Sequence, residues 1–122
     1  MGLTFAEKIL AKHAGKERVV PGEIVVIKPD YVMSHDNSAA ISGKFKQTGA
    51  PKVADPDQIL IILDHCVPAA TEKYASNHQV IRQFVNEQGI RNFYDINTGV
   101  CHQVAIEKGY ARPGRLLVGS DS

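Results

Sequence analysis

Ile59-Leu60-Ile61-Ile62-Leu63 is the longest apolar run in the chain, and it decides the predicted fold. Its five residues are branched and do not alternate with polar ones, which is typical of a strand covered on both faces, as in parallel sheets. Segments with helical spacing separate the other strand-like segments, an alternation that is typical of parallel α/β units. The sequence therefore predicts an α/β fold with a mainly parallel sheet flanked by helices.

The other expected elements follow from caps, glycines and prolines. Thr4 and Glu7 form a capping box that begins a helix, and Gly15 ends that helix. Pro29 keeps the following residues extended, because proline disrupts a helix interior. Further helices are expected from 37 or 38 towards 49, from about 69 to 88 and from 101 to 108, and further strands at 24–27, 92–96 and 116–118.

Length and composition predict one domain and exclude several classes of protein. The chain has 122 residues, with 14 Lys plus Arg and 13 Asp plus Glu, for a formal net charge of +1. This length predicts a single α/β segment over residues 1–122. Near-neutrality argues against a nucleic-acid partner, because phosphate binding needs clustered Lys and Arg. No apolar run approaches the roughly 20 residues of a membrane span.

Two observations concern the cell compartment. The N-terminal residues carry Glu7 and lack the apolar block of a signal peptide. The two cysteines, Cys66 and Cys101, are too few for a disulfide framework. Both observations lead us to expect a cytoplasmic protein.

Polar residues gather directly after the strand-like segments. The clusters are Ser34-His35-Asp36-Asn37, Asp64-His65-Cys66, Asp95-Ile96-Asn97-Thr98 and Gly119-Ser120-Asp121-Ser122, with Cys101-His102 at the start of the short helix. In a parallel sheet the carboxyl ends of the strands meet at one edge, so we expect these groups to converge there. Neighbouring His and Asp side chains suit general acid–base chemistry, because the carboxylate orients the imidazole and stabilises its protonated form.

Each cluster taken alone also fits a structural role. Asp and Asn after strands are ordinary turn and helix-capping residues. Asp64-His65 is the exception, because two ionisable groups directly behind a buried strand are costly unless they are paired or used. His78 lies on the apolar stripe of the long helix and is expected to be a core or boundary histidine with a satisfied side chain.

A zinc site is the rival interpretation of the His and Cys residues. It would draw its ligands from His35, His65, Cys66, Cys101 and His102. The chain has no Cys-x-x-Cys pair and no finger-type spacing, so we expect no metal ligands within this segment. Phosphate-loop, dinucleotide-binding and nucleophile-elbow motifs are absent from the sequence.

Several stretches, in order along the chain, resemble the N-terminal part of the aconitase superfamily, in particular the large subunits of 3-isopropylmalate dehydratase and homoaconitase. They are Thr4-Phe5-Ala6-Glu7-Lys8-Ile9-Leu10, Pro21-Gly22-Glu23, Ser34-His35-Asp36, Leu63-Asp64-His65-Cys66-Val67-Pro68, Gly99-Val100-Cys101-His102-Gln103, Gly109-Tyr110-Ala111-Arg112-Pro113-Gly114 and Leu117-Val118-Gly119-Ser120-Asp121-Ser122. Their number and order make the resemblance far more specific than any single stretch would.

The resemblance implies an iron–sulfur hydro-lyase. Family members move the hydroxyl of a hydroxylated di- or tricarboxylic acid to the neighbouring carbon by dehydration and rehydration. A 4Fe-4S cluster with one open iron acts on the leaving hydroxyl as a Lewis acid. The implied substrate is 2-isopropylmalate, in leucine biosynthesis, with homoaconitate chemistry as the second choice. The implied partner is the small subunit of the dehydratase.

Six residues take roles from the resemblance. The catalytic residues are Asp64, His65, His102 and Asp121, and the substrate-binding residues are His35 and Ser122. Asp64 and His65 resemble the pair that protonates the departing hydroxyl, and His102 with Asp121 resembles a second such pair. His35 resembles a residue that contacts substrate, and Ser122 resembles a serine that binds a substrate carboxylate.

The family's three cluster cysteines lie beyond this segment, and neither Cys66 nor Cys101 matches them. We therefore expect the chain to be the N-terminal part of a longer large subunit, inactive and without a cluster when isolated. Surfaces that the whole protein would bury are expected to favour self-association. A stable standalone module, with a ligand-binding or assembly role and no catalysis, is the alternative.

Overall fold

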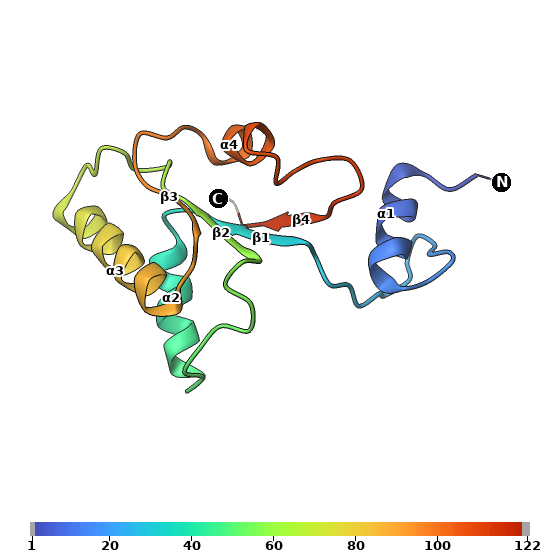
Figure 1. The fold of residues 1–122 in the computed structure, drawn as a ribbon, viewed down its shortest axis with the longest axis horizontal. Coiled ribbons are helices and arrows are strands. Elements are labelled where there is room, and N and C mark those ends of the chain that lie inside the picture. Colours follow the sequence, from blue (N-terminus) through green and yellow to red (C-terminus); the bar gives the residue numbers. More distant parts are fainter. Residues whose placement is uncertain (1, 121–122) are drawn as a thin grey trace.

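The apolar run forms β2 (Ile59–Ile62), an inner strand of a four-stranded sheet in the computed structural model, which describes residues 2–120. The other strands are β1 (Tyr31–Ser34), β3 (Asn92–Tyr94) and β4 (Leu117–Gly119). The strand order is β3-β2-β1-β4, and every pair is parallel (Figure 1). The predicted α/β class with a parallel sheet is confirmed.

Helices cover both faces of the sheet. Helices α2 (Ser38–Gln47) and α3 (Glu72–Gln88) lie on one face, and α4 (Cys101–Glu107) lies on the other (Figure 1). This division follows from right-handed crossovers: the chain moves from β1 to β3 in one direction and returns to β4 in the other, which places the returning helix on the opposite face.

Both faces of β2 are buried, which explains its unbroken apolar sequence. One core contains Met33, Leu60, Ile62, Cys101, Val104 and Ala105, on the side of α4. The other contains Ile61, Leu63, Ile81, Phe84, Val85 and Ile90, on the side of α3. Successive residues of a strand point to opposite faces, so a strand between two helical layers needs apolar residues at every position.

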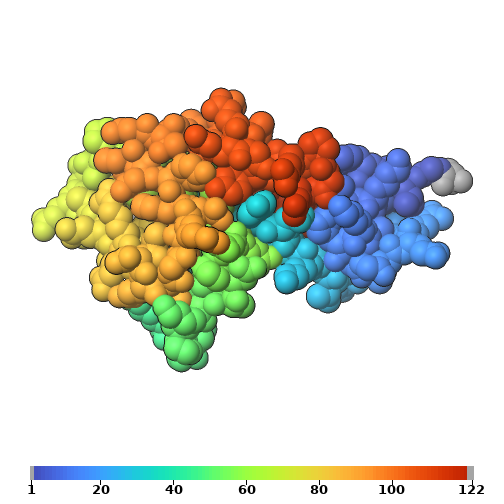
Figure 2. Space-filling model, in the orientation of Figure 1, coloured from blue at the N-terminus to red at the C-terminus, as the bar shows by residue number. Residues whose placement is uncertain are grey.

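The first helix, α1 (Phe5–Ala14), confirms the predicted capping box and glycine end. It lies with the following loop at one end of the molecule, away from the helices that cover the sheet (Figures 1 and 2). Asp30 ties this end to the sheet: its carboxylate accepts hydrogen bonds from His13 Nε2 at 2.8 Å and from the backbone N–H of Leu116 at 2.8 Å.

The predicted strand at 24–27 is wrong. These residues form neither strand nor helix, and the side chains of Ile24 and Val26 are 93% and 90% exposed. The first strand is β1, in a segment that was expected only to be extended. β-Branched residues favour a strand, but a strand needs a hydrogen-bonded neighbour, and β1 is the segment that the sheet pairs with β2 and β4.

No helix among residues 2–120 has the length and apolar character to cross a membrane.

Candidate active site

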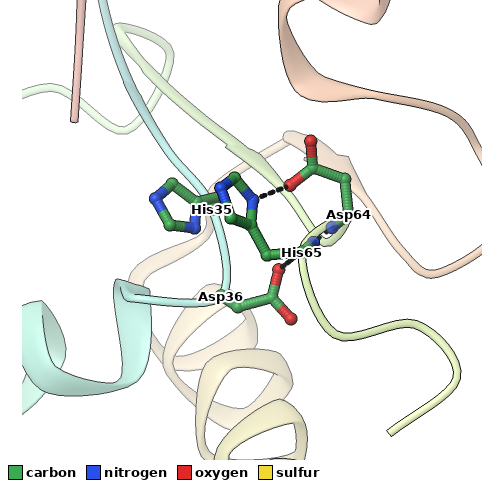
Figure 3. A group of neighbouring side chains, drawn as sticks. All are labelled: His35, Asp36, Asp64 and His65. Carbon is green, nitrogen blue, oxygen red and sulfur yellow. Dashed lines mark hydrogen bonds and ion pairs between the residues drawn. The ribbon is translucent and has the colours of Figure 1, made fainter. Parts of the chain in front are cut away.

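The polar residues that follow β1 and β2 meet at the carboxyl edge of the sheet, as predicted. His35, Asp36, Asp64 and His65 each offer a nitrogen or oxygen atom, and these atoms all lie within 4.8 Å of one another. Figure 3 shows the side chains of the two loops lying close together. The parallel sheet thus joins residues about 30 positions apart into one cluster.

Asp64 and His65 form a hydrogen-bonded carboxylate–imidazole pair. Asp64 Oδ1 lies 2.6 Å from His65 Nδ1 (Figure 3), and Asp64 Oδ2 accepts the backbone N–H of Cys101 at 2.5 Å. The Asp64 side chain is 5% exposed, whereas that of His65 is 34% exposed. The pair therefore has a buried carboxylate that orients a solvent-accessible ring, the arrangement that acid–base work requires.

The charge of Asp64 is stabilised by its partners. Burial alone would raise the pKa of the Asp64 carboxyl, but the Cys101 backbone N–H and the His65 imidazole outweigh it and hold that pKa below its usual value. Cys101 is the first residue of α4, so its hydrogen bond also ties the Asp64 carboxylate to α4, on the face of the sheet opposite α2 and α3. At neutral pH the Asp64 side chain is an anion.

His35 lies directly against His65. Their rings are stacked, with centroids 3.8 Å apart and planes at 16°. His35 is buried and His65 exposed, so the inner ring forms a flat support for the outer one. The structure thus places His35, the predicted substrate contact, in the same cluster as the predicted acid–base pair.

Asp36 is the member of the cluster that sequence reasoning did not assign to the site. Its carboxylate accepts the backbone N–H groups of Asp64 and His65 at 3.0 and 2.9 Å, and His78 Nε2 lies 2.6 Å from its other oxygen. The expectation that His78 is a core histidine with a satisfied side chain is confirmed, since it is 3% exposed and bonded to Asp36. A buried imidazole on the apolar stripe of a helix needs a hydrogen-bond partner. The position of His78 on that stripe was therefore the one sequence signal that a polar partner such as Asp36 lies nearby.

Two other polar clusters have structural roles. Asp95 accepts two hydrogen bonds at 2.7 Å from the Arg82 guanidinium, which ties the end of β3 to α3. Asn37 donates from Nδ2 to Ser120 Oγ at 3.0 Å, which links the loops after β1 and β4. Asp95 is therefore paired with Arg82 and does not belong to the four-residue group found in the part of the chain that the structure describes.

The other predicted site residues are His102, Asp121 and Ser122. His102 is in the first turn of α4, where it is exposed, and it does not belong to the four-residue group found among residues 2–120. Asp121 and Ser122 lie outside the described residues. The proposed second pair, His102 with Asp121, therefore stays a prediction.

The cluster has the residue types of a metal site, but its atoms are used in other ways. Both oxygens of Asp64 and both oxygens of Asp36 accept hydrogen bonds, and His65 Nδ1 faces Asp64. A metal ion would have to displace several of these bonds. The geometry favours a hydrogen-bonded proton-transfer pair over a cation site.

The chain is similar to known proteins over nearly its whole length. Residues 7–122 match the model of a family described as the aconitase family (aconitate hydratase). The chain is 50% identical to "Probable 3-isopropylmalate dehydratase large subunit" of Methanothermobacter thermautotrophicus and 42% identical to the 3-isopropylmalate dehydratase large subunit of Herpetosiphon aurantiacus. It is 40% identical to "Probable methanogen homoaconitase large subunit" of Methanothermobacter thermautotrophicus.

These matches cover nearly all of the chain but only part of each relative. The first two cover 100% of this chain, and the third covers 98%. The matched regions are 29%, 30% and 29% of the respective relatives. The chain therefore spans less than a third of the length of these relatives.

Proposed function

The chain belongs to the aconitase family, and on that premise we propose that it forms the N-terminal part of a hydro-lyase large subunit. The proposed enzyme isomerises a hydroxycarboxylic acid by removing and re-adding water. The observation that carries this proposal is the Asp64–His65 pair, with its buried carboxylate and exposed imidazole at the carboxyl edge of the sheet.

In this proposal, His65 delivers a proton to the departing hydroxyl and takes it back in the reverse reaction. Because Nδ1 faces Asp64, the proton moves at Nε2. Asp64 stabilises the protonated ring and fixes its plane, and the stacked His35 ring limits its rotation. His35 would contact the substrate, Ser122 would bind a substrate carboxylate, and His102 with Asp121 would form a second pair.

The residues of this chain do not fit the role of cluster ligands. Iron–sulfur clusters of the 4Fe-4S type are held by cysteine thiolates, and the chain has only two cysteines. Cys101, the first residue of α4, is 1% exposed within the core between α4 and the sheet, and Cys66 lies on the loop after β2. We therefore place the cluster ligands in the rest of the whole enzyme and expect the isolated chain to be inactive.

The names of the relatives support the choice of substrate. Two of those named above are 3-isopropylmalate dehydratase large subunits, which favours 2-isopropylmalate as substrate and a role in leucine biosynthesis. The homoaconitase relative makes homoaconitate chemistry the second choice. Since these relatives are large subunits, we propose a dehydratase small subunit as the partner. A cytoplasmic location is proposed from the two free thiols.

A chimeric enzyme tests this function directly. In the Herpetosiphon aurantiacus large subunit, the region that matches this chain is replaced by the chain itself, and the small subunit and cluster are supplied anaerobically. The unmodified subunit is the positive control, and a chimera with His65→Ala is the matched negative control. We expect the chimera to convert 2-isopropylmalate and the His65→Ala chimera to be strongly impaired.

Two results would contradict the proposal. A folded chimera that holds the cluster but does not turn over 2-isopropylmalate, homocitrate or citrate would favour the standalone-module alternative. Turnover or iron binding by the isolated 122-residue chain would show that the His and Cys residues form a complete site by themselves.

Self-association of the isolated chain is part of the proposal. An apolar groove lies beside β4, an edge strand of the sheet. It includes Val32, Ile41 and Val118, all of which are at least 42% exposed. Burying such a surface against a second copy would lower its free energy. Sedimentation velocity at high concentration checks this expectation, and a clean monomer would contradict it.

A further inference from the structure

We propose that Asp36 is a positioning residue for the Asp64–His65 pair and that His78 fixes the orientation of the Asp36 carboxylate. The inference rests on the proposed function, in which this pair moves a proton. It adds two residues that act through the pair and carry no role in the sequence-based assignment.

Asp36 binds three successive backbone N–H groups of the loop after β2. Its Oδ2 accepts the N–H groups of Asp64 and His65 at 3.0 and 2.9 Å, and its Oδ1 accepts that of Cys66 at 3.3 Å. The loop is neither helix nor strand, so these bonds replace the regular hydrogen bonds that would otherwise fix its path. The direction in which the His65 side chain leaves the backbone therefore depends on Asp36.

A carboxylate is the side chain that suits this position. Four donors converge on two oxygens, and a buried group with that many donors must be an acceptor only. Burial alone would raise the pKa of the Asp36 carboxyl, but the His65 backbone N–H, the His78 imidazole and the Asp64 backbone N–H lower it below its usual value. Asp36 stays ionised and keeps both oxygens as acceptors.

His78 connects this carboxylate to the body of the protein. Its Nε2 lies 2.6 Å from Asp36 Oδ1, and its side chain is 4% exposed. His78 is on α3, one turn before Ile81, which is fully buried against β2. Because α3 is packed against the sheet, the His78 bond holds the Asp36 carboxylate in one orientation. The elements β1, β2 and α3 together therefore set the position of the Asp64–His65 pair.

The experiment measures the pair directly in the 122-residue chain by NMR. It follows the ring proton on His65 Nδ1, whose resonance moves far downfield when it is bonded to a carboxylate, and the hydrogen exchange of the Asp64 and His65 amides. The variants are Asp36→Ala, Asp36→Asn, His78→Leu and His78→Gln. Asp30→Asn is the matched control, because Asp30 also accepts an imidazole Nε2 and a backbone N–H but lies at the opposite end of β1.

Asp36→Ala is expected to abolish the downfield resonance and to speed exchange of the Asp64 and His65 amides by roughly tenfold or more. Asp36→Asn is expected to retain the downfield resonance and the slow amide exchange only in part. Its carbonyl oxygen can accept the Asp64 and His65 amides while His78 changes tautomer to accept its NH2 group, but the Cys66 N–H then loses its acceptor. His78→Leu is expected to weaken the resonance, and His78→Gln to restore it, because the Gln amide nitrogen can occupy the place of Nε2.

Two results would overturn the proposal. An unchanged His65 resonance with unchanged amide exchange in a folded Asp36→Ala chain would show that the loop holds its shape without Asp36. Equal loss of the resonance in Asp30→Asn would show that general loosening, not positioning, causes the effect. If Asp36→Ala does not fold, the contrast between His78→Leu and His78→Gln decides, and two identical spectra would refute the role of His78.

These readouts need neither substrate nor cluster, so they stand apart from the proposed function. The Herpetosiphon chimera with Asp36→Ala answers the separate question of activity, where we expect kcat to fall more than KM rises. Should the NMR changes occur while the chimera keeps full activity, the acid–base role of Asp64–His65 would be wrong and the positioning role of Asp36 would stand.

Discussion

Asp64→Asn is the substitution whose result follows most directly from the geometry of the site. The carboxylate uses one oxygen for His65 Nδ1 and the other for the backbone N–H of Cys101. Asparagine offers only one acceptor oxygen, together with an NH2 group that donates. The His65 ring N–H and the Cys101 backbone N–H, which now face Asp64 together with the Cys101 thiol, must therefore compete for a single oxygen.

The buried donor should win this competition. Cys101 is 1% exposed, so its N–H would be left without any partner, at a cost of about 1–3 kcal/mol. His65 is exposed, and water can replace its bond. We expect the Asn oxygen to turn to Cys101 and its NH2 group to face His65 Nδ1, which then becomes an acceptor and moves the ring proton to Nε2.

Two measurements check this expectation. The nitrogen chemical shifts of the His65 ring report its tautomer, and urea unfolding followed by circular dichroism reports stability. Losing one charge-assisted bond to a partly exposed partner should cost about 1 kcal/mol. With a slope of about 1.5–2 kcal/mol per M urea, the midpoint should fall by roughly 0.5–0.7 M.

Asp95→Asn is the matched control. Asp95 also binds through two oxygens, but its side chain is 42% exposed whereas that of Asp64 is 5% exposed, so the midpoint should change by less. The His65 tautomer should not change at all. A folded Asp64→Asn chain in which His65 keeps its proton on Nδ1 would refute the competition between the two donors.

Other changes test the fold around the site. The Leu116 backbone N–H, with His13 and Arg115, holds the pKa of the Asp30 carboxyl well below its usual value. The stability that this carboxylate contributes is therefore present above its unfolded-state pKa near 4 and is lost as pH falls towards the lower folded-state pKa. In the Asp30→Asn variant the free energy of unfolding should therefore fall less steeply as the pH is lowered. Leu60→Ala, within the core, should lower the free energy of unfolding in urea by about 2–5 kcal/mol. Val32→Ala, at a position 42% exposed, should lower it far less, and equal losses would contradict the core assignment. Gly43→Ala should stabilise the chain by about 0.5–1 kcal/mol, because Gly43 lies inside α2 with nothing within 4 Å of an added Cβ, and a lower melting temperature would contradict it.

The sequence predicted those features that depend on local pattern. The unbroken run at 59–63 predicted a strand between two helical layers, and β2 lies between two cores. The capping box at Thr4 predicted the start of α1. The rule that parallel strands end at one edge predicted that Asp64, His65 and His35 would meet.

The local sequence pattern gave a wrong prediction where the pairing of strands decides the structure. The β-branched residues 24–27 have strong strand propensity, yet they remain unpaired and largely exposed. The strand forms at 31–34 instead, because only there does the backbone find neighbours on both sides. Strand propensity reports how a residue fits a sheet and says nothing of whether a sheet is within reach.

By itself, the sequence determined the α/β class, the family motifs and the pairing of neighbours such as Asp64 and His65, because periodicity and short spacing are local properties of the chain. Tertiary structure alone decided that Asp36 binds the backbone 28 and 29 residues further along and accepts a bond from His78, 42 residues away. Such bonds form only after the sheet and α3 have packed and excluded water, and that burial makes each unsatisfied donor costly.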